Sequence, residues 1–501
     1  MNKNKYFYLY SLLLFLWCLP FLFYQDFYRD DYTRLVSGYA GWENAGRPLA
    51  TLLYNLLSMN IGTISNLYPL PMFLSILSLA YVFSKLHENI KRYHSAFSDW
   101  IITPAILLIV ANPFFIQNLA YQYDVLPMCL ALATSLLAFL ILDNSKKNIA
   151  ISVLLLVISL SFYQPASNVF VVITLFHLSV SLKPSPASLR SILSHFLVYI
   201  TSLTVYYLLV FVVSPVKPIR SEKITLSELP KSLERNYDAF LSILNNLHSP
   251  LWLVLSCFLL ISGWVISKAF TFYRQKRGLI FSSLVALSPF LILCFIWGPL
   301  LMLKETMSFP RTYMSMGMIL CGMSLIATQK LRLLVIPTYL FIFSSAIVLN
   351  SFCFVQHQQF IFETKAIGDT VAEISKDKKL YSTLMIFSYG NMPLAKNTVF
   401  LREKIPYLNQ IQKPAYRWET RFKMALLGFD YTNSMYTYKV ADNGDEWNRI
   451  CKESPDGIFS LQIKTPYSDV YYDKNKKYTS IWFRDENTSL CDKQPLEFDA
   501  E

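Results

Sequence analysis

The chain has 501 residues, of which 54% are hydrophobic, 16% aromatic and only 16% charged. A soluble domain carries roughly 25% charged residues, so this composition excludes an ordinary soluble protein. The mean hydropathy of +0.36 indicates a polytopic membrane protein. The net charge of +12 does not indicate nucleic-acid binding, because Lys and Arg collect in the cytoplasmic loops of membrane proteins and the sequence shows no nucleic-acid-binding module.

Apolar runs near the roughly 20 residues that cross a bilayer recur through the first 350 positions. They predict about eleven transmembrane spans, near residues 6–24, 67–86, 99–112, 125–142, 148–162, 166–182, 193–214, 249–269, 279–302, 312–328 and 333–353. The first run is too long for a typical signal peptide, and Gln25-Asp26-Phe27 follows it where a cleavage site would have small residues. We therefore expect a retained membrane anchor.

A polar loop, residues 25–66, follows the first span directly. Its charged residues include Asp26, Arg29, Asp30, Asp31, Arg34, Glu43 and Arg47. Ionisable residues packed this densely at a membrane face are costly and are usually functional. Within the loop, residues 49–62 are predicted to form an amphipathic helix that begins near Pro48 and lies at the membrane interface, with a short span as the alternative.

Lys and Arg in the short loops set the orientation. They fall on one side of the predicted spans, at Lys3, Lys5, Lys85, Lys91, Arg92, Lys146, Lys147, Lys183, Arg190, Arg274, Lys276, Arg277, Lys330 and Arg332. The positive-inside rule makes that side the cytoplasm. The N-terminus is then cytoplasmic, and the loop 25–66 and the C-terminal tail face the opposite side. The loop 215–248 is an exception because it carries five basic residues there, but it is long and also acidic.

The chain changes character after about residue 354, where it becomes charged and rich in Tyr, Asp and Asn. Residues 384–388 and 480–484 are predicted to be strands, and residues 362–375 a helix. The tail is long enough for one small domain. We expect an all-α membrane domain over residues 1–353 and an α+β domain over residues 354–501.

The acids and bases of the loop suit a reaction on a lipid-linked phosphate. Asp30 or Asp31 would act as a general base for a sugar hydroxyl; the alternative is a solvated loop in which an Asp caps a helix. Arg34 and Arg47 would bind phosphate oxygens through their guanidinium groups, or else anchor lipid head groups. Arg311 and Lys304 are further phosphate candidates, because they are predicted to lie on the same side as Asp30.

Polar and aromatic clusters stand where other spans meet the same face. They comprise residues 112–118, the run Tyr121-Gln122-Tyr123-Asp124, the run 161–165 with Gln164, and residues 308–311. Aromatic rings stack on sugars and amides bind hydroxyls, but aromatic belts also occur at every membrane interface. The sequence has no nucleotide-binding motif and no metal-ligand spacing, so we expect no cofactor and no metal.

The order of these motifs resembles a known family. The first span, Asp30-Asp31 with Arg34, Gly41-Trp42, Gly46-Arg47-Pro48-Leu49, and later Asn112-Pro113-Phe114-Phe115 with residues 121–127, are similar to the serotype-converting O-antigen glucosyltransferases of Gtr type II. The resemblance covers about residues 1–350 and does not extend to the tail. It implies a GT-C-like fold in the bacterial inner membrane with the reaction on the periplasmic face, which is then the side that the positive-inside rule gives to the tail.

The resemblance also implies a reaction. Such enzymes transfer glucose from undecaprenyl-phosphate glucose to a sugar of the lipid-linked O-antigen. Carried over by position, Asp30 or Asp31 is the base and Glu43 a second acid candidate. The expected substrate-binding residues are Arg34, Arg47, Arg311, Lys304, Trp42, Gln122, Asp124 and Gln164. Expected partners are the lipid-linked donor and acceptor, membrane lipids, and a donor-synthesising glucosyltransferase with a flippase.

Two other functions fit a polytopic chain. An O-antigen polymerase or ligase usually has its large outer loop between late spans, whereas the acidic cluster here follows the first span, which favours a transferase. A transporter or flippase would have ionisable residues at mid-membrane and interrupted helices in matching halves. The apolar runs hold almost no charge, so a transporter is disfavoured.

Among the eight cysteines, Cys451 and Cys491 stand in the polar tail. If the tail faces an oxidising compartment, they are the natural disulfide pair. We therefore expect both to resist alkylation in the folded protein under non-reducing conditions and to label after reduction, as measured by mass spectrometry of the labelled peptides. Free labelling of both without reductant would contradict the pairing.

Overall fold

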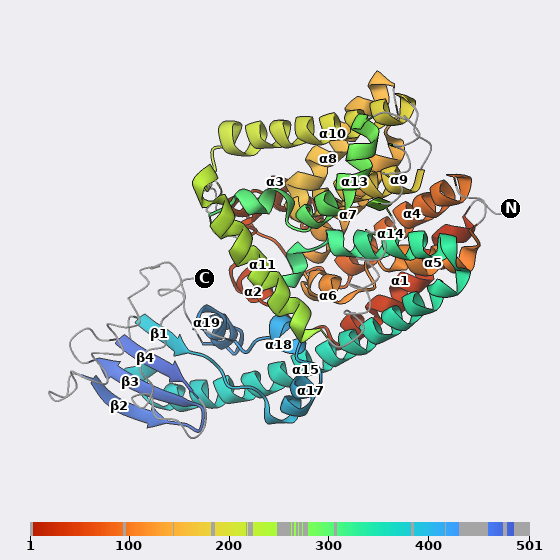
Figure 1. The fold of residues 1–501 in the computed structure, drawn as a ribbon. Coiled ribbons are helices and arrows are strands. Elements are labelled where there is room, and N and C mark those ends of the chain that lie inside the picture. The colour runs from red at the N-terminus through yellow and green to blue at the C-terminus, as the bar shows by residue number, and fades with distance from the viewer. Residues whose placement is uncertain are drawn as a thin grey trace. The chain divides into compact units, whose positions relative to one another are not determined.

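The contacts of the chain divide it into two compact units (Figure 1). The computed structural model describes residues 4–93, 97–143, 145–181, 186–216, 218, 224–247, 279–304, 308–381, 385–415, 417–429, 459–473 and 478–484, with a few single positions between 262 and 273. The first unit, here the membrane unit, comprises Met1–Gln25, Tyr39–Cys353 and Ile405–Ile411. The second, here the tail unit, comprises Asp26–Gly38, Phe354–Lys404 and Gln412–Glu501.

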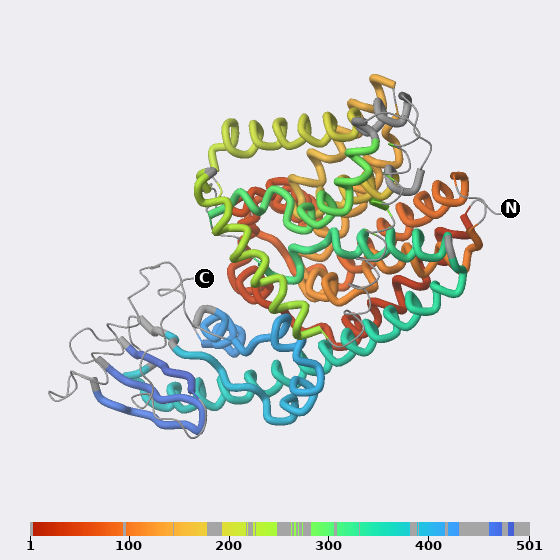
Figure 2. Tube along the Cα trace, in the orientation of Figure 1, coloured from red at the N-terminus to blue at the C-terminus, as the bar shows by residue number. Residues whose placement is uncertain are grey.

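The described part of the membrane unit is helical, as the trace in Figure 2 shows. Its elements are α1 (Lys5–Tyr24), η1 (Trp42–Ala45), α3 (Pro48–Leu57), α4 (Leu70–Tyr93), α5 (Asp99–Leu107), α6 (Pro113–Ala120), α7 (Val125–Ile141), α8 (Lys146–Phe162), η2 (Gln164–Ser167), α9 (Asn168–Ser181), α10 (Pro186–Tyr207), η3 (Leu208–Val213), η4 (Leu226–Glu228), α11 (Leu229–Asn246), α13 (Leu279–Cys294), η5 (Gly298–Met302), η6 (Pro310–Thr312), α14 (Ser315–Lys330), η7 (Arg332–Leu334), the first part of α15 (Val335–Lys376) and α18 (Leu408–Ile411).

Four described helical segments are long and apolar enough to cross a membrane. They are Lys5–Tyr24, Leu70–Tyr93, Leu193–Val213 and Arg332–Lys376, and shorter apolar helices accompany them. The prediction of a mostly helical membrane protein is confirmed, but the count of about eleven spans is not. The predicted span 249–269 lies almost wholly outside the described residues.

The third predicted span, residues 99–112, is wrong as a single crossing helix. Its helix, α5, has only nine residues, and a rise of about 1.5 Å per residue makes it less than half as long as a bilayer core of about 30 Å. The chain turns after Leu107 and resumes as α6 at Pro113, which can begin a helix but cannot continue one. All eight residues of α6 are buried.

Several helices of the membrane unit pack side by side. α1 packs on α4, α4 on α7, α7 on α8, and α8 on α10, while α14 packs on α5 and α9. Serines of α8 connect it to α7: Ser159 Oγ donates to the Ala131 carbonyl at 2.8 Å, and Ser152 Oγ donates to the Ala138 carbonyl at 2.9 Å. Such interhelical hydrogen bonds are a common means of holding apolar helices together in lipid.

The tail unit combines short helices with a sheet (Figure 1). Its described elements are α2 (Asp31–Ser37), the second part of α15, α16 (Lys378–Tyr381), β1 (Met385–Gly390), η8 (Lys396–Thr398), α17 (Val399–Lys404), α19 (Arg417–Leu426), β2 (Phe459–Lys464), β3 (Ser468–Asp473) and β4 (Tyr478–Phe483). The sheet order is β1-β4-β3-β2, with β1 parallel to β4 and the other pairs antiparallel. The predicted α+β character and the strands at 384–388 and 480–484 are confirmed.

The hydrophobic core of the tail unit lies between α15 and one face of the sheet. Ile367 and Ile374 of α15 pack in one cluster with Val470 of β3, Ile481 of β4 and Met424 of α19. Val470 and Ile481 are direct partners across the β3–β4 ladder, so they present one continuous apolar surface. Thr370 and Ser468 share a hydrogen bond of 2.7 Å at the edge of this cluster.

The predicted boundary between a last span ending near 353 and a separate helix at 362–375 is wrong at the level of secondary structure. α15 is one helix of 42 residues. The sequence turns polar after Cys353, and this change suggested a break, but polarity alone does not end a helix. No proline follows Pro337 before the helix ends at Lys376, so nothing in that stretch forces an interruption.

Two glycines of the tail unit have the same kind of positive φ but differ in the space around them. Gly390 ends β1 with φ +76°, and an added Cβ would lie 2.1 Å from the Phe483 carbonyl oxygen. Gly428 has φ +86° with nothing within 4 Å. We expect Gly428→Ala to cost about 1 kcal/mol and Gly390→Ala at least about 3 kcal/mol, measured by thermal unfolding of the full chain. Equal losses would contradict the close approach.

Candidate active site

A tight turn in the membrane unit leads from η1 into α3 and carries Arg47. Gly46 lies at the turn with φ +72°, and an added Cβ would lie 2.8 Å from the Tyr206 hydroxyl. The Gly46 carbonyl accepts hydrogen bonds from the Tyr206 hydroxyl at 2.8 Å and from Gln164 Nε2 at 3.1 Å. Gln164 Nε2 also donates to the Ala45 carbonyl at 2.9 Å. Gln164 and Tyr206 therefore hold the turn from α10 and η2.

A buried carboxylate gathers the next group of residues. Asp124 is 3% exposed, and its Oδ1 accepts a hydrogen bond from Trp42 Nε1 at 2.8 Å. Nη1 of Arg47 lies 3.4 Å from the same oxygen. The Trp42 ring stacks on Tyr54, with centroids 5.0 Å apart. The structure thus brings together three residues that the sequence singled out separately: Trp42, Arg47 and Asp124.

Tyr163 connects this group to Arg311. The guanidinium carbon of Arg47 lies 4.5 Å from the centre of the Tyr163 ring, and the Tyr163 hydroxyl donates to the Arg311 carbonyl at 3.1 Å. The Arg311 guanidinium lies over the Tyr121 ring, 4.9 Å from its centre, and also bonds the Tyr121 hydroxyl. Each arginine therefore rests on an aromatic face, an arrangement that attracts a cation.

The remaining predicted residues of the membrane unit have separate partners. The Gln122 side chain donates to the Gln25 carbonyl at 2.7 Å and accepts from Asn66 at 3.2 Å. Glu43 accepts a hydrogen bond from the Thr51 hydroxyl, which joins η1 to the first turns of α3. Lys304 is exposed and interacts electrostatically with Glu228.

The acidic pair belongs to the tail unit. Asp30 is the residue before α2, half-buried, and its side chain makes no helix-capping hydrogen bond. Asp31 is fully buried, and its Oδ2 accepts a hydrogen bond from the Tyr28 backbone N–H at 3.0 Å. Arg34 lies in the last turn of α2. The two carboxylates, adjacent in sequence, thus have different surroundings.

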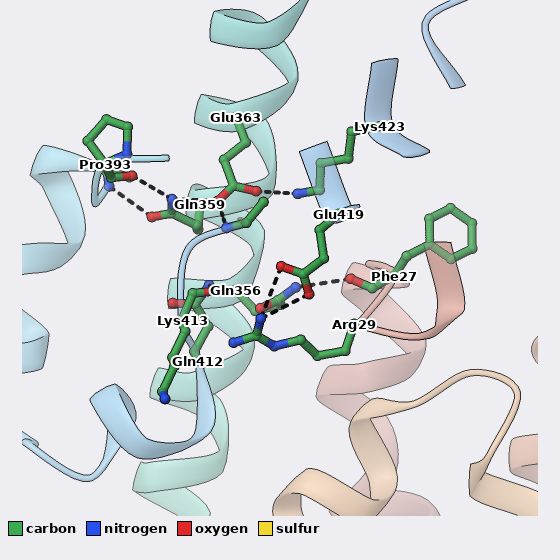
Figure 3. Close-up of polar contacts among 12 residues, drawn as sticks. Phe27, Arg29, Gln356, Gln359, Glu363, Pro393, Gln412, Lys413, Glu419 and Lys423 are labelled. Atoms are coloured by element: carbon green, nitrogen blue, oxygen red, sulfur yellow. Dashed lines mark hydrogen bonds and ion pairs between the residues drawn. The ribbon is translucent and has the colours of Figure 1, made fainter. Parts of the chain in front are cut away.

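Side chains of the tail bond the segment that carries this pair (Figure 3). Nη1 of Arg29 donates to both carboxylate oxygens of Glu419, at 2.9 and 3.0 Å. Lys423 forms an ion pair with Glu363 and lies 4.6 Å from the centre of the Tyr32 ring.

Sequence reasoning missed Tyr163, Tyr206, Glu419 and Lys423. Tyr163 neighbours Gln164 in the polar and aromatic run 161–165, but nothing in that run indicates that Arg47 lies over its ring or that its hydroxyl bonds the Arg311 carbonyl. Glu419 and Lys423 are spaced to share one face of α19 with Phe422, so charges on an apolar helix face were the available signal.

No group of three or more potential metal ligands occurs among the described residues. Cys451 and Cys491 lie outside the described residues, so their predicted pairing stays a prediction.

The long apolar helices define a helical membrane protein, and buried Asp124 with the aromatic-supported Arg47 and Arg311 forms a charged cluster within its membrane unit. A family model for glucosyl transferase GtrII matches residues 19–322, more than half of the chain, and the chain belongs to this family. The resemblance inferred from the motifs is confirmed. The matched segment contains the acidic loop, Asp124, Tyr163 and Arg311.

One relative among curated proteins comes from Salmonella phage P22 and is described as an uncharacterized 55.3 kDa protein in the gtrB 5′ region. It is 37% identical over 167 residues, which are 32% of this chain and 33% of the relative. The match therefore spans only about a third of either protein. No solved structure matches the chain significantly.

The hydrogen bond from Trp42 to buried Asp124 is open to a direct test. Trp42→Phe keeps an aromatic ring on Tyr54 but removes the N–H donor, which leaves the carboxylate less well satisfied. We expect a loss of about 1–3 kcal/mol in the thermal unfolding of the purified chain. Trp100→Phe is the control, because Trp100 is exposed and its change should stay within about 0.5 kcal/mol. Equal effects would contradict the role of the bond.

Proposed function

We propose that the chain transfers glucose from undecaprenyl-phosphate glucose to a sugar of the lipid-linked O-antigen on the periplasmic face of the inner membrane. The observation that carries this proposal is membership in the GtrII family over residues 19–322. The phage relative, whose description refers to the gtrB region, is consistent with it. The basic short loops support a cytoplasmic N-terminus and a periplasmic tail.

The proposed reaction needs one base and one means of stabilising the leaving group. An acceptor hydroxyl oxygen attacks C1 of glucose, the bond from C1 to the phosphate oxygen breaks, and undecaprenyl phosphate leaves. The base takes the hydroxyl proton, and cations stabilise the charge on the departing phosphate. Neither step requires a metal or a cofactor.

Asp30 is the better candidate for the base. A general base must come within hydrogen-bond reach of the hydroxyl it deprotonates. Asp31 is fully buried and already accepts the Tyr28 N–H, which suits a residue that shapes the loop. Asp30 is half-buried and does not cap α2 with its side chain, so its carboxylate is better placed to meet a substrate.

Arg47 and Arg311 are the proposed phosphate ligands. An aromatic face beneath a guanidinium holds the plane of the group, and guanidinium N–H groups bind phosphate oxygens. Trp42, Gln122, Asp124 and Gln164 bond other groups of the protein, so we assign them to shaping the site rather than to direct substrate contact. Arg34, Glu43 and Lys304 stay candidates for binding the sugars.

The first test is structural analysis of the O-antigen repeat from cells with the wild-type chain, with Asp30→Asn, with Asp31→Asn, with Arg47→Gln, and with no chain. We expect the wild type to add a hexose and Asp30→Asn to lower transfer about 10²–10⁴-fold. Arg47→Gln should weaken transfer because it removes charge from the leaving-group site.

Membrane levels of each variant are measured in parallel, so that loss of protein is not mistaken for loss of chemistry. Asp31→Asn should lower the level of folded protein more than Asp30→Asn does, because its carboxylate is buried. An identical repeat in all five strains would contradict the proposed function.

A further inference from the structure

The segment Asp26–Gly38 has little structure of its own. Its one helix, α2, has seven residues, and a helix that short is marginal in isolation. Arg29 adopts φ +51°, a left-handed conformation that is unfavourable for a residue with a side chain. A strained, short segment of this kind persists only when surrounding groups determine its conformation.

The surrounding groups come from helices far along the chain. From α15, Gln356 Nε2 donates to the Phe27 carbonyl at 3.0 Å. His357 Nδ1 lies 3.1 Å from Oδ1 of Asp26. Burial raises the pKa of the Asp26 carboxyl, and His357 lowers it partway back.

From α19, Glu419 accepts hydrogen bonds from Arg29, as Figure 3 shows. The Glu419 side chain is 3% exposed. Burial raises its pKa, while Arg29 and Lys423 act in the opposite direction. A carboxylate this deeply buried is stable in its charged form only with such partners.

Lys423 connects Tyr32 to α15. Burial lowers the pKa of its ammonium group, but Glu363 and Tyr32 outweigh burial and the pKa lies above its ordinary value. Glu363 is itself fixed, because its Oε1 accepts hydrogen bonds from Gln359 at 2.8 Å and from the Ala415 N–H at 2.7 Å. The Lys423 charge is therefore held in a defined place beneath the Tyr32 ring.

These contacts bracket the acidic pair. Arg29 on one side and Tyr32 on the other are each bound by α19, and only Asp30 and Asp31 stand between them. We propose that Glu419 and Lys423 are positioning residues of the transferase: they fix the backbone that presents Asp30 and Asp31. This role rests on the proposed function, and it extends the functional part of the chain beyond the family-matched residues 19–322.

The test is steady-state kinetics of the purified full-length chain with undecaprenyl-phosphate glucose as donor and lipid-linked O-antigen as acceptor. Glu419→Gln keeps the shape of the side chain but removes the charge that holds Arg29. We expect kcat to fall at least about tenfold, because displacement of a reacting group by an ångström has effects of this size. KM for the donor should change less than about twofold, since the Glu419 side chain is buried against Arg29 and is proposed to act only through it.

The matched control is Asp469→Asn, which breaks another buried ion pair of the tail unit. Asp469 pairs with Arg484 at 2.8 Å and lies in β3. We expect its kcat per folded protein to stay within about twofold of wild type. If Asp469→Asn lowers kcat as much as Glu419→Gln does, the effect is general destabilisation and the positioning role is wrong.

A graded series keeps the test decisive if Glu419→Gln folds poorly. Arg29→Lys retains a charged nitrogen that can donate to the Glu419 carboxylate, as Nη1 of Arg29 does, so kcat should fall less than with the uncharged Arg29→Gln. The double variant Arg29→Gln/Glu419→Gln should be no slower than the slower single variant, because the two residues act as one pair.

The outcomes separate the two proposals. A wild-type chain that transfers no glucose overturns the proposed function, and the positioning role with it. A wild-type chain that transfers glucose, together with a Glu419→Gln variant whose kcat is unchanged, overturns the positioning role alone.

Discussion

The structure depends on one constraint: a charge removed from water must find a partner inside the protein. In the membrane unit, buried Asp124 is met by Arg47 and by the Trp42 N–H. In the tail unit, Glu419 is met by Arg29, and Glu363 by Lys423. Each pairing joins segments far apart in the sequence, and two of them fix the loop after α1, at Arg29 and at Arg47.

Aromatic rings give three of the cations a second kind of support besides ion pairs and hydrogen bonds. Arg47 lies over Tyr163, Arg311 over Tyr121, and Lys423 over Tyr32. A ring face attracts a cation without neutralising it, so each group is held in place while it keeps its charge. Under the proposed function this support suits a phosphate ligand, because a second, bidentate carboxylate would compete with phosphate oxygens for the guanidinium N–H donors.

Local pattern and composition predicted α1, a helix beginning at Pro48 (α3), and the strands β1 and β4, because each depends on periodicity or on helix-start chemistry within a few residues. The same patterns gave wrong helix ends at α5 and α15, because hydropathy alone does not determine where a helix ends. The motif order located Trp42, Arg47, Asp124 and Arg311, but it did not indicate that Trp42 and Arg47 share Asp124 or that Tyr163 contacts Arg47 and the Arg311 carbonyl. No local rule pairs Arg29 with a residue 390 positions later, so Glu419 and Lys423 lay beyond sequence reasoning.

Because Asp26–Gly38 belongs to the tail unit, the tail unit includes the acidic pair as well as the C-terminal residues. Along the chain, this segment connects α1 to η1, and the residues on both sides of it, Gln25 and Tyr39, belong to the membrane unit. Its charged Asp26 and Arg29, however, find their partners on α15 and α19, at His357 and Glu419 respectively. A family description that ends at residue 322 therefore contains the acidic pair but not Glu419 and Lys423, whose contacts with Arg29 and Tyr32 flank that pair.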